Sequence, residues 1–133
     1  MDQTVLVTEQ IDAGREFVEA FNGYQAVDVS FWLNPADSSE WFLYVASESI
    51  DDSNLDIAYG EVLRLVGSGR KMWLDAFQVK LLNSDDALAM KAKEIRDRHP
   101  APLATRYNGT SIAGIPVSGA YIYPHINATA IAR

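Results

Sequence analysis

The stretch Phe31–Ala46, FWLNPADSSEWFLYVA, decides the fold of this chain. Its pattern predicts two short strands joined by the turn NPADSS, because Pro, Asp and Ser favour turns and end strands. Side chains of a strand point alternately to the two faces of a sheet, so a hairpin with one buried face is polar at every second position. Here large apolar side chains occupy both sets of positions. We therefore expect both faces of the hairpin to be covered, by the rest of the chain, by a second copy or by a ligand.

Three segments around this hairpin carry apolar residues at the spacing of amphipathic helices. Each begins at a residue type that commonly caps helices, and each ends at Gly or Pro, which commonly terminate them. The predicted caps are Thr8, Ser53 and Ser84, and the predicted stops are Asn22-Gly23, Gly67 and Pro100.

Strands are predicted over Ala26–Leu33, Glu40–Ala46 and Phe77–Leu81. In the third strand Phe77, Val79 and Leu81 share one face and polar residues share the other. Two or three more strands follow, with Asn108-Gly109 as a hairpin-turn signal. The order α-β-β-α-β-α-β-β predicts a single α+β domain over residues 1–133, with a mixed or antiparallel sheet of about five strands and three helices packed mainly on one face.

The composition is that of a folded protein outside membranes. The 133 residues are 48% hydrophobic, which argues against disorder. No apolar run approaches the roughly 20 residues that cross a bilayer. The start of the sequence lacks the features of a secretory signal, and the absence of cysteine rules out a disulfide framework. We therefore expect a cytoplasmic protein that does not bind membranes.

Charge is distributed unevenly along the chain. Residues 1–63 hold 13 acidic side chains and one basic one, whereas residues 64–133 hold 5 acidic and 10 basic ones, and the net charge is −7. If the halves form separate faces, the molecule is a dipole that can pair with itself or steer an oppositely charged partner. If they interleave in the fold, they neutralise each other. The overall acidity argues against nucleic-acid binding.

No catalytic, phosphate-binding or metal-binding motif stands out. Asp52, Asn54 and Asp56 have the spacing of the first ligands of a calcium loop. The later positions that require Gly and Glu are Ile57 and Leu63, so helix capping explains the acidic residues better. The two histidines lack metal-ligand spacing. We expect no metal and no cofactor.

Aromatic side chains are the best candidates for a ligand site, because aromatic-lined concavities are the usual shape of small-molecule sites. The stretch AYIYPHIN places Tyr121, Tyr123 and His125 on one face of an extended segment. The candidate ligand-binding residues are Trp32, Trp41, Tyr44, Tyr59, Trp73, Tyr121, Tyr123 and His125. The candidate interface residues on the second hairpin face are Trp32, Phe42 and Tyr44; in the other possible register, Trp41 and Leu43 take the places of Phe42 and Tyr44.

Three functions remain open at this point. The doubly apolar hairpin and the charge asymmetry favour a non-enzymatic binding module that self-associates as a homodimer. The first alternative is a small-molecule-binding domain with an aromatic-lined pocket. The second is a small enzyme with acid–base groups near the C-terminal Tyr/His stretch. The acid–base groups available to such an enzyme are Asp28, Glu48, Asp75, Tyr123 and His125.

Overall fold

The computed structural model describes residues 6–67, 73–98, 104–107 and 109–124, which form a single α+β domain. The helices are α1 (Thr8–Tyr24), α2 (Leu55–Gly67), α3 (Ala87–Asp97) and the short 3-10 helix η1 (Ala76–Gln78). The strands are β1 (Val29–Pro35), β2 (Phe42–Ser47), β3 (Val79–Asn83), β4 (Thr105–Tyr107), β5 (Ser111–Ile112) and β6 (Ile115–Ile122). The predicted order of helices and strands is confirmed, and the C-terminal part contributes three strands, of which β6 is the longest described strand.

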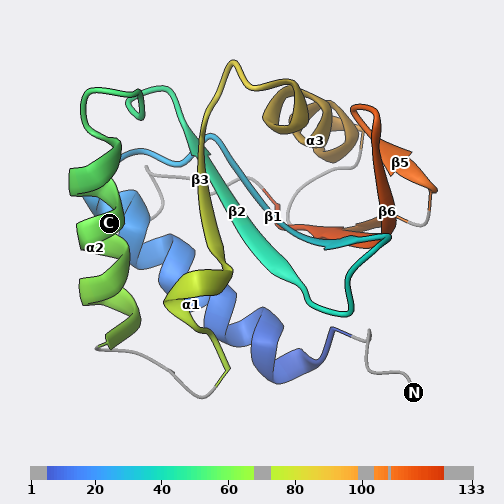
Figure 1. Cartoon of the computed structure of the whole chain (residues 1–133), viewed down its shortest axis with the longest axis horizontal. Coiled ribbons are helices and arrows are strands. Elements are labelled where there is room, and N and C mark those ends of the chain that lie inside the picture. The colour runs from blue at the N-terminus through green and yellow to red at the C-terminus, as the bar shows by residue number, and fades with distance from the viewer. Residues whose placement is uncertain (1–5, 68–72, 99–103, 108, 125–133) are drawn as a thin grey trace.

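The strands form a mixed sheet in the order β3-β2-β1-β6-β4, with β5 paired to β6. β1 is antiparallel to both β2 and β6, whereas β2 and β3 are parallel and are connected through α2. β3 is therefore an edge strand, and it lies beside α2 (Figure 1).

One face of the β1–β2 hairpin packs against α1 and α2. Trp32 lies opposite Leu43 in the hairpin register, and both side chains are fully buried. They join Val45 and the apolar stripe of α1, which includes Phe17 and Phe21, in one core. Figure 1 shows α1 and α2 on one side of the strands and α3 on the other.

The second face of the hairpin packs against α3. Phe31 and Leu33 of β1 form a separate core with Ile122 of β6 and with the apolar residues of α3, which are Leu88, Ala89, Ala92 and Ile95. The hairpin is thus covered on both faces by its own chain, which explains why both of its faces are apolar. Two of the three described helices lie on one face, and α3 lies alone on the other.

The predicted N-cap residues of α1 and α3, Thr8 and Ser84, do not cap these helices in the structure. α1 begins at Thr8 and has Val7 as its N-cap. α3 is capped by Asp86 rather than Ser84, because the Asp86 carboxylate accepts a hydrogen bond from the Leu88 N–H at 2.9 Å. Ser84 belongs to the preceding turn, where the Asn83 side chain accepts from the backbone N–H of residue 85 at 2.8 Å.

The C-terminal hairpin turns at Ala113-Gly114 rather than at Asn108-Gly109. Ala113 and Gly114 both have positive φ, as the two central residues of a type I′ turn require. This turn joins β5 to β6, and β4 also pairs with β6 rather than with β5. Asn108 lies outside the described residues.

The acidic and basic halves of the chain interleave. β3 and β6, which come from the basic half, flank the β2–β1 pair from the acidic half. Lys93 of α3 lies 3.2 Å from the carboxylate of Asp28, which joins the two halves by an ion pair. The halves therefore do not form separate faces, and charge complementarity has to be judged from local contacts.

Candidate functional site

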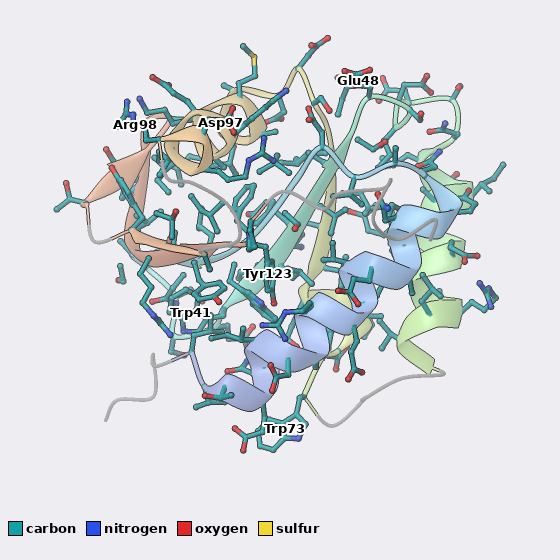
Figure 2. The ribbon with its side chains drawn as sticks, turned by 180° about the vertical axis from the view of Figure 1, so that it is seen from behind. Trp41, Glu48, Trp73, Asp97, Arg98 and Tyr123 are labelled. Atoms are coloured by element: carbon teal, nitrogen blue, oxygen red, sulfur yellow. The ribbon has the colours of Figure 1, made fainter. Side chains whose placement is uncertain are left out.

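The predicted ligand-binding aromatic residues are divided between the two cores, and Trp32, Trp41, Tyr59, Tyr121 and Tyr123 belong to or pack against the same one. Trp32 and Tyr123 belong to the core beneath α1 and α2, whereas Tyr44 packs against the core beneath α3. The sheet itself separates these two groups. Figure 2 shows Trp41, Trp73 and Tyr123 at separate positions, and Trp73 projects away from the ribbon.

Trp32 and Tyr123 satisfy each other's polar atoms inside the first core. Trp32 Nε1–H donates to Tyr123 Oη at 2.8 Å, and Tyr123 Oη–H donates to the carbonyl oxygen of Ile11 in α1 at 2.6 Å. Burial raises the pKa of Tyr123 far above its usual value, although the Trp32 hydrogen bond opposes this by favouring the phenolate. Because its donor and acceptor are used within the protein, Tyr123 has a structural role.

Tyr121 and His125 are the other two candidate residues of the C-terminal stretch AYIYPHIN. The guanidinium of Arg106 lies 5.1 Å from the centroid of the half-buried Tyr121 ring, and that ring packs edge-on against Tyr123. His125 lies outside the described residues. The described residues of this stretch therefore anchor the end of β6 to the core.

The candidate interface residues Trp32, Phe42 and Tyr44 do not lie on one face of the sheet, because the register places Trp32 with Leu43 instead. Trp32 is 0% exposed and faces α1. Phe42 and Tyr44 are half-buried on the opposite face of the sheet. Tyr44 stacks on Phe31 with ring centroids 5.1 Å apart, and the ammonium group of Lys80 lies 5.2 Å from the Phe42 ring centroid.

Of the predicted acid–base groups, Asp28 and Glu48 share one hollow, and Asp75 and Tyr123 lie elsewhere. Asp28 and Glu48 line a hollow of about 770 Å³ at the carboxyl ends of β2 and β3. Ligands often bind at the carboxyl ends of parallel strands, so this is the natural place to look for chemistry. Asp75 caps η1 instead, and Tyr123 is buried in the core. An acid–base pair requires two groups within reach of one substrate atom, and among the described candidates Asp28 and Glu48 are the two that line one hollow.

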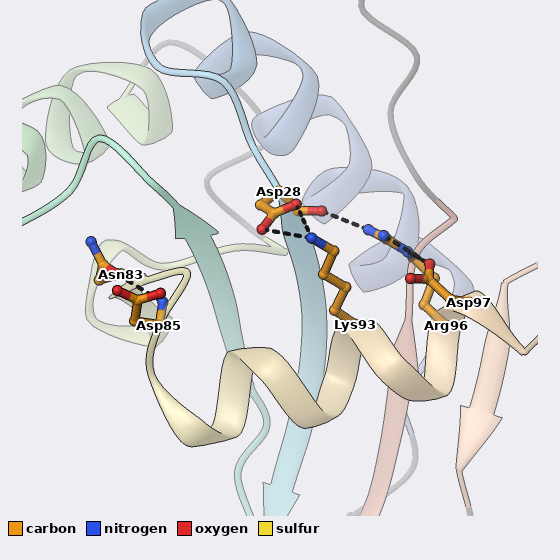
Figure 3. A network of polar contacts seen from close by, with 6 residues as sticks. All are labelled: Asp28, Asn83, Asp85, Lys93, Arg96 and Asp97. Atoms are coloured by element: carbon orange, nitrogen blue, oxygen red, sulfur yellow. Dashed lines mark hydrogen bonds and ion pairs between the residues drawn. The ribbon is translucent and has the colours of Figure 1, made fainter.

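Charged side chains around this hollow are paired with each other (Figure 3). Lys93 contacts the Asp28 carboxylate, while Arg96 donates to the Asp28 carbonyl oxygen at 2.6 Å and forms an ion pair with Asp97 at 2.9 Å. Among the residues that the structure describes, no group of three or more His, Cys, Asp or Glu side chains is placed to hold a metal ion. These contacts fasten α3 to the start of β1.

Phe77 is the functional candidate that the sequence analysis missed. At 85% it is the most exposed of the large apolar side chains that the structure describes, although its place in the predicted strand implied burial. Leu63 of α2 is 63% exposed, and it lines a small hollow together with Phe77. Exposed apolar side chains that cluster are a feature of binding surfaces.

A local turn explains why Phe77 points outward. The Asp75 carboxylate accepts from the Phe77 N–H at 2.9 Å, and Gln78 Oε1 accepts from the Asp75 N–H at 2.8 Å. This reciprocal capping box closes η1, so β3 begins at Val79 and the expected alternation never includes Phe77. The spacing of Asp and Gln in DAFQ is the signal that could have revealed the turn.

Two hollows flank Phe77. The larger one, of about 420 Å³, lies beside Trp41 and Asp75. The smaller one, of about 270 Å³, is mostly apolar, and Phe77 forms one of its walls. Its other lining residues are Tyr59, Val62, Leu63, Ala76, Val79 and Lys80. We refer to Phe77, Leu63 and this smaller hollow together as the Phe77 surface.

The edge of the sheet beside the Phe77 surface is partly closed. Tyr59 Oη accepts a hydrogen bond from the Leu81 N–H of β3 at 2.9 Å. An open edge strand offers its backbone groups to another strand, and this contact occupies one of them. The Phe77 surface therefore offers side chains, rather than a full backbone ladder, to a partner.

Comparison with known proteins adds no functional assignment. No family model matches the chain, and neither a curated protein nor a solved structure is significantly similar to it. Within the described ranges, no helix combines the length and the apolar character needed to cross a membrane. The function is therefore argued from the geometry.

Proposed function

We propose that this protein is a non-enzymatic binding module that self-associates through the Phe77 surface. The observation that carries the proposal is the 85% exposure of Phe77 beside a preformed apolar hollow. Aromatic side chains that enter well-formed pockets dominate the energetics of protein interfaces. The lack of cysteine suits such an interface to a reducing compartment such as the cytoplasm.

The size of the smaller hollow supports a side chain as its occupant. Small-molecule sites usually enclose roughly 300–1,000 Å³, and this hollow encloses about 270 Å³. Burying one Phe side chain contributes about 1.5–3 kcal/mol. Association costs at least about 4 kcal/mol in lost freedom, so Phe77 must act together with other contacts such as Leu63.

The alternative functions have less support. A small-molecule site cannot use all of the predicted aromatic residues at once, because Tyr44 lies on the other face of the sheet from Trp32 and Tyr123, whose polar atoms are bonded to each other. An acid–base enzyme would have to use Asp28 and Glu48, which line one hollow, and the Asp28 carboxylate there is already engaged by Lys93.

The test is the solution mass of the full-length protein, measured by light scattering over a range of concentrations. We expect a dimer for the native chain and a folded monomer for Phe77→Glu, because the substitution removes the apolar side chain that fills the hollow and replaces it with a charge that is costly to bury. The matched control is Met90→Glu, since Met90 is 57% exposed on α3 at the other face of the sheet. A native chain that stays monomeric at high micromolar concentration, or a dimer indifferent to Phe77→Glu, would overturn the proposal.

A further inference from the structure

We infer that the hollow at the carboxyl ends of β2 and β3 binds a small organic cation with primary ammonium groups. Glu48 and Asp85 supply the carboxylates that hold the ammonium groups, and the Ser84 hydroxyl supplies a hydrogen bond. The hollow encloses about 770 Å³, and we refer to it as the Glu48 hollow. It is a different surface from the Phe77 surface, so binding there does not depend on self-association.

Both cations that line the Glu48 hollow are already paired with carboxylates of its lining. The Lys93 ammonium lies 3.2 Å from the Asp28 carboxylate, and the Arg98 guanidinium lies 3.1 Å from the Glu94 carboxylate. Two opposite charges in contact largely cancel each other's field, so neither cation offsets a further negative charge. The net charge of the hollow is therefore set by its remaining carboxylates.

Three carboxylates of the lining remain, and two of them have no cation. Asp97 forms an ion pair with Arg96 at 2.9 Å. Glu48 and Asp85 are both exposed, and within the described part of the chain neither carboxylate has a cationic partner. A cationic ligand gains from these two unpaired charges, whereas an anionic ligand is repelled by them. The charges of the hollow therefore favour a cation.

The sheet topology places the two unpaired carboxylates at the same end of the sheet. Glu48 directly follows β2, and Ser84 and Asp85 directly follow β3, which is parallel to β2. Ligands of open sheets bind outside the carboxyl ends of parallel strands. Figure 2 shows Glu48 well apart from Asp97 and Arg98, so unpaired and paired charges line different parts of the hollow.

The Ser84 hydroxyl is a second and independent indication of a ligand. Ser84 lines the hollow, and its Oγ atom is buried without a hydrogen-bond partner among the described residues. Its backbone is held in place, because the Ser84 N–H donates to the Ser47 carbonyl oxygen at 3.2 Å. Buried polar atoms are nearly always hydrogen-bonded. An unpartnered hydroxyl at the wall of a hollow therefore indicates a partner that enters the hollow.

An ammonium group suits these acceptors better than a guanidinium group or a metal ion. It carries three N–H donors that point in different directions, whereas the guanidinium donors lie in one plane and suit a single carboxylate. The described acidic residues, those of the hollow included, form no group of three placed to hold a metal ion. The volume of about 770 Å³ lies within the roughly 300–1,000 Å³ of small-molecule sites. The ligand class is therefore a small primary amine.

The experiment titrates the full-length protein with linear diaminobutane, which carries an ammonium group at each end, at neutral pH. Linear butanediol is the uncharged control ligand of the same length. Backbone amide signals are followed by two-dimensional NMR, so that their shifts give both the dissociation constant and the position of the ligand. The titration uses low salt, because salt screens interactions between exposed charges.

Three variants each remove one proposed contact. Glu48→Gln and Asp85→Asn remove a carboxylate charge, and Ser84→Ala removes the hydroxyl. The matched control is Asp37→Asn, because Asp37 is an exposed carboxylate between β1 and β2 that does not line the hollow. Urea unfolding of each variant is measured beside its binding. Asp85 also complements the positive end of α3, so Asp85→Asn lowers the stability of the protein independently of any ligand.

We expect diaminobutane to bind with a dissociation constant on the order of 1 mM and to shift the amide signals of Glu48, Ser84 and Asp85. Glu48→Gln and Asp85→Asn should each weaken binding about two- to fivefold, and the double variant about tenfold. Ser84→Ala should weaken binding without lowering the free energy of unfolding, because its hydroxyl makes no hydrogen bond among the described residues. Asp37→Asn should bind as the native chain does.

Several results would overturn the inference. One is the absence of saturable binding up to about 10 mM diaminobutane. Another is equal weakening by Asp37→Asn, or equal shifts with butanediol, because a chain of net charge −7 attracts cations without a site. A lysine tetrapeptide that binds more than about tenfold more tightly than diaminobutane would make a basic protein segment the ligand instead. Phe77→Glu should bind diaminobutane normally, so failure here leaves the proposed self-association intact.

Discussion

Trp32 and Tyr123 are joined by a buried hydrogen bond of 2.8 Å that connects two neighbouring strands, β1 and the end of β6. Tyr123 extends the connection to α1 by donating to the Ile11 carbonyl oxygen at 2.6 Å. One hydroxyl group thus links the centre of the sheet to the helix that covers it. Several properties of the fold should depend on this link.

Tyr123→Phe should lower the free energy of unfolding by about 1–3 kcal/mol, because it leaves the buried Trp32 N–H without its acceptor. Urea unfolding monitored by circular dichroism measures the change. The control is Tyr107→Phe, in which the lost bond to the Ser111 carbonyl oxygen is exposed and water replaces it. An equal loss of unfolding free energy in both variants would mean that the buried Trp32–Tyr123 bond stabilises the protein no more than the exposed Tyr107 bond.

The free energy of unfolding should fall above about pH 10, because the Tyr123 hydroxyl is buried in the folded protein. Burial raises the pKa of Tyr123 in the folded protein, whereas in the unfolded chain tyrosine titrates near pH 10. Between these two pKa values the folded state keeps a proton that the unfolded state has lost. The contribution is therefore complete below about pH 10, and the free energy of unfolding then decreases by up to about 1.4 kcal/mol per pH unit.

The measurement is urea unfolding of the native chain and of Tyr123→Phe from pH 8 to about pH 11.5, a range set by the ordinary tyrosine pKa. The free energy of unfolding of Tyr123→Phe should decline less steeply with pH than that of the native chain. Burial also raises the pKa of the half-buried Tyr44, so some decline remains in the variant. Parallel curves for the two proteins would show that Tyr123 does not cause the loss.

Gly14→Ala should destabilise the protein by about 1–3 kcal/mol, although alanine is the better helix former. A Cβ atom at Gly14 would lie 2.8 Å from Trp32 Nε1 and closer still to Tyr123 Oη. α1 therefore packs against these two side chains only because this position has no side chain.

The matched control for that substitution is Gly60→Ala in α2, where an added Cβ meets nothing within 4 Å. It should stabilise the protein by about 0.5–1 kcal/mol, because it removes the backbone freedom of glycine in the unfolded chain. Thermal unfolding of both variants gives the comparison. A stabilising effect at both positions would contradict the close approach of α1 to the sheet.

Much of the fold follows from local signals in the sequence. The two apolar faces of the β1–β2 hairpin predicted cover on both sides, and α2 begins and ends close to its predicted capping residues Ser53 and Gly67. The strand order does not follow, because the pairing of β1 with β6 joins residues far apart in sequence, such as Phe31 and Ile122. No local pattern distinguishes that pairing from others.

The candidate site was harder to predict than the fold. Alternation from Phe77 to Leu81 indicated a strand with Phe77 buried, and a capping box at Asp75 overrode that pattern over three residues. A short turn of this kind competes with a strand signal of the same length, and only the polar pair at its ends favours it. The most exposed aromatic residue was therefore assigned to the core, whereas Trp32, which is buried, was assigned to an interface.

Trp32→Asp separates these two interpretations of the hairpin. As an interface residue, Trp32 could be replaced by Asp with loss of the dimer and retention of a folded monomer. In the structure Trp32 is 0% exposed and bonded to Tyr123, so the substitution removes a large buried side chain and buries a carboxylate beside Leu43. Such changes cost about 3–5 kcal/mol or more, a large part of the about 5–15 kcal/mol that stabilises a typical domain.

We expect Trp32→Asp to be largely unfolded, with loss of far-ultraviolet circular dichroism and rapid proteolysis. The comparison is Phe77→Glu, which changes an exposed aromatic residue and should keep native circular dichroism while losing the dimer. A folded, monomeric Trp32→Asp would place Trp32 at a surface and contradict the packing of α1 on β1. The opposite effects of these two substitutions, on stability in one and on association in the other, follow from the turn at Asp75 and the pairing of Trp32 with Tyr123.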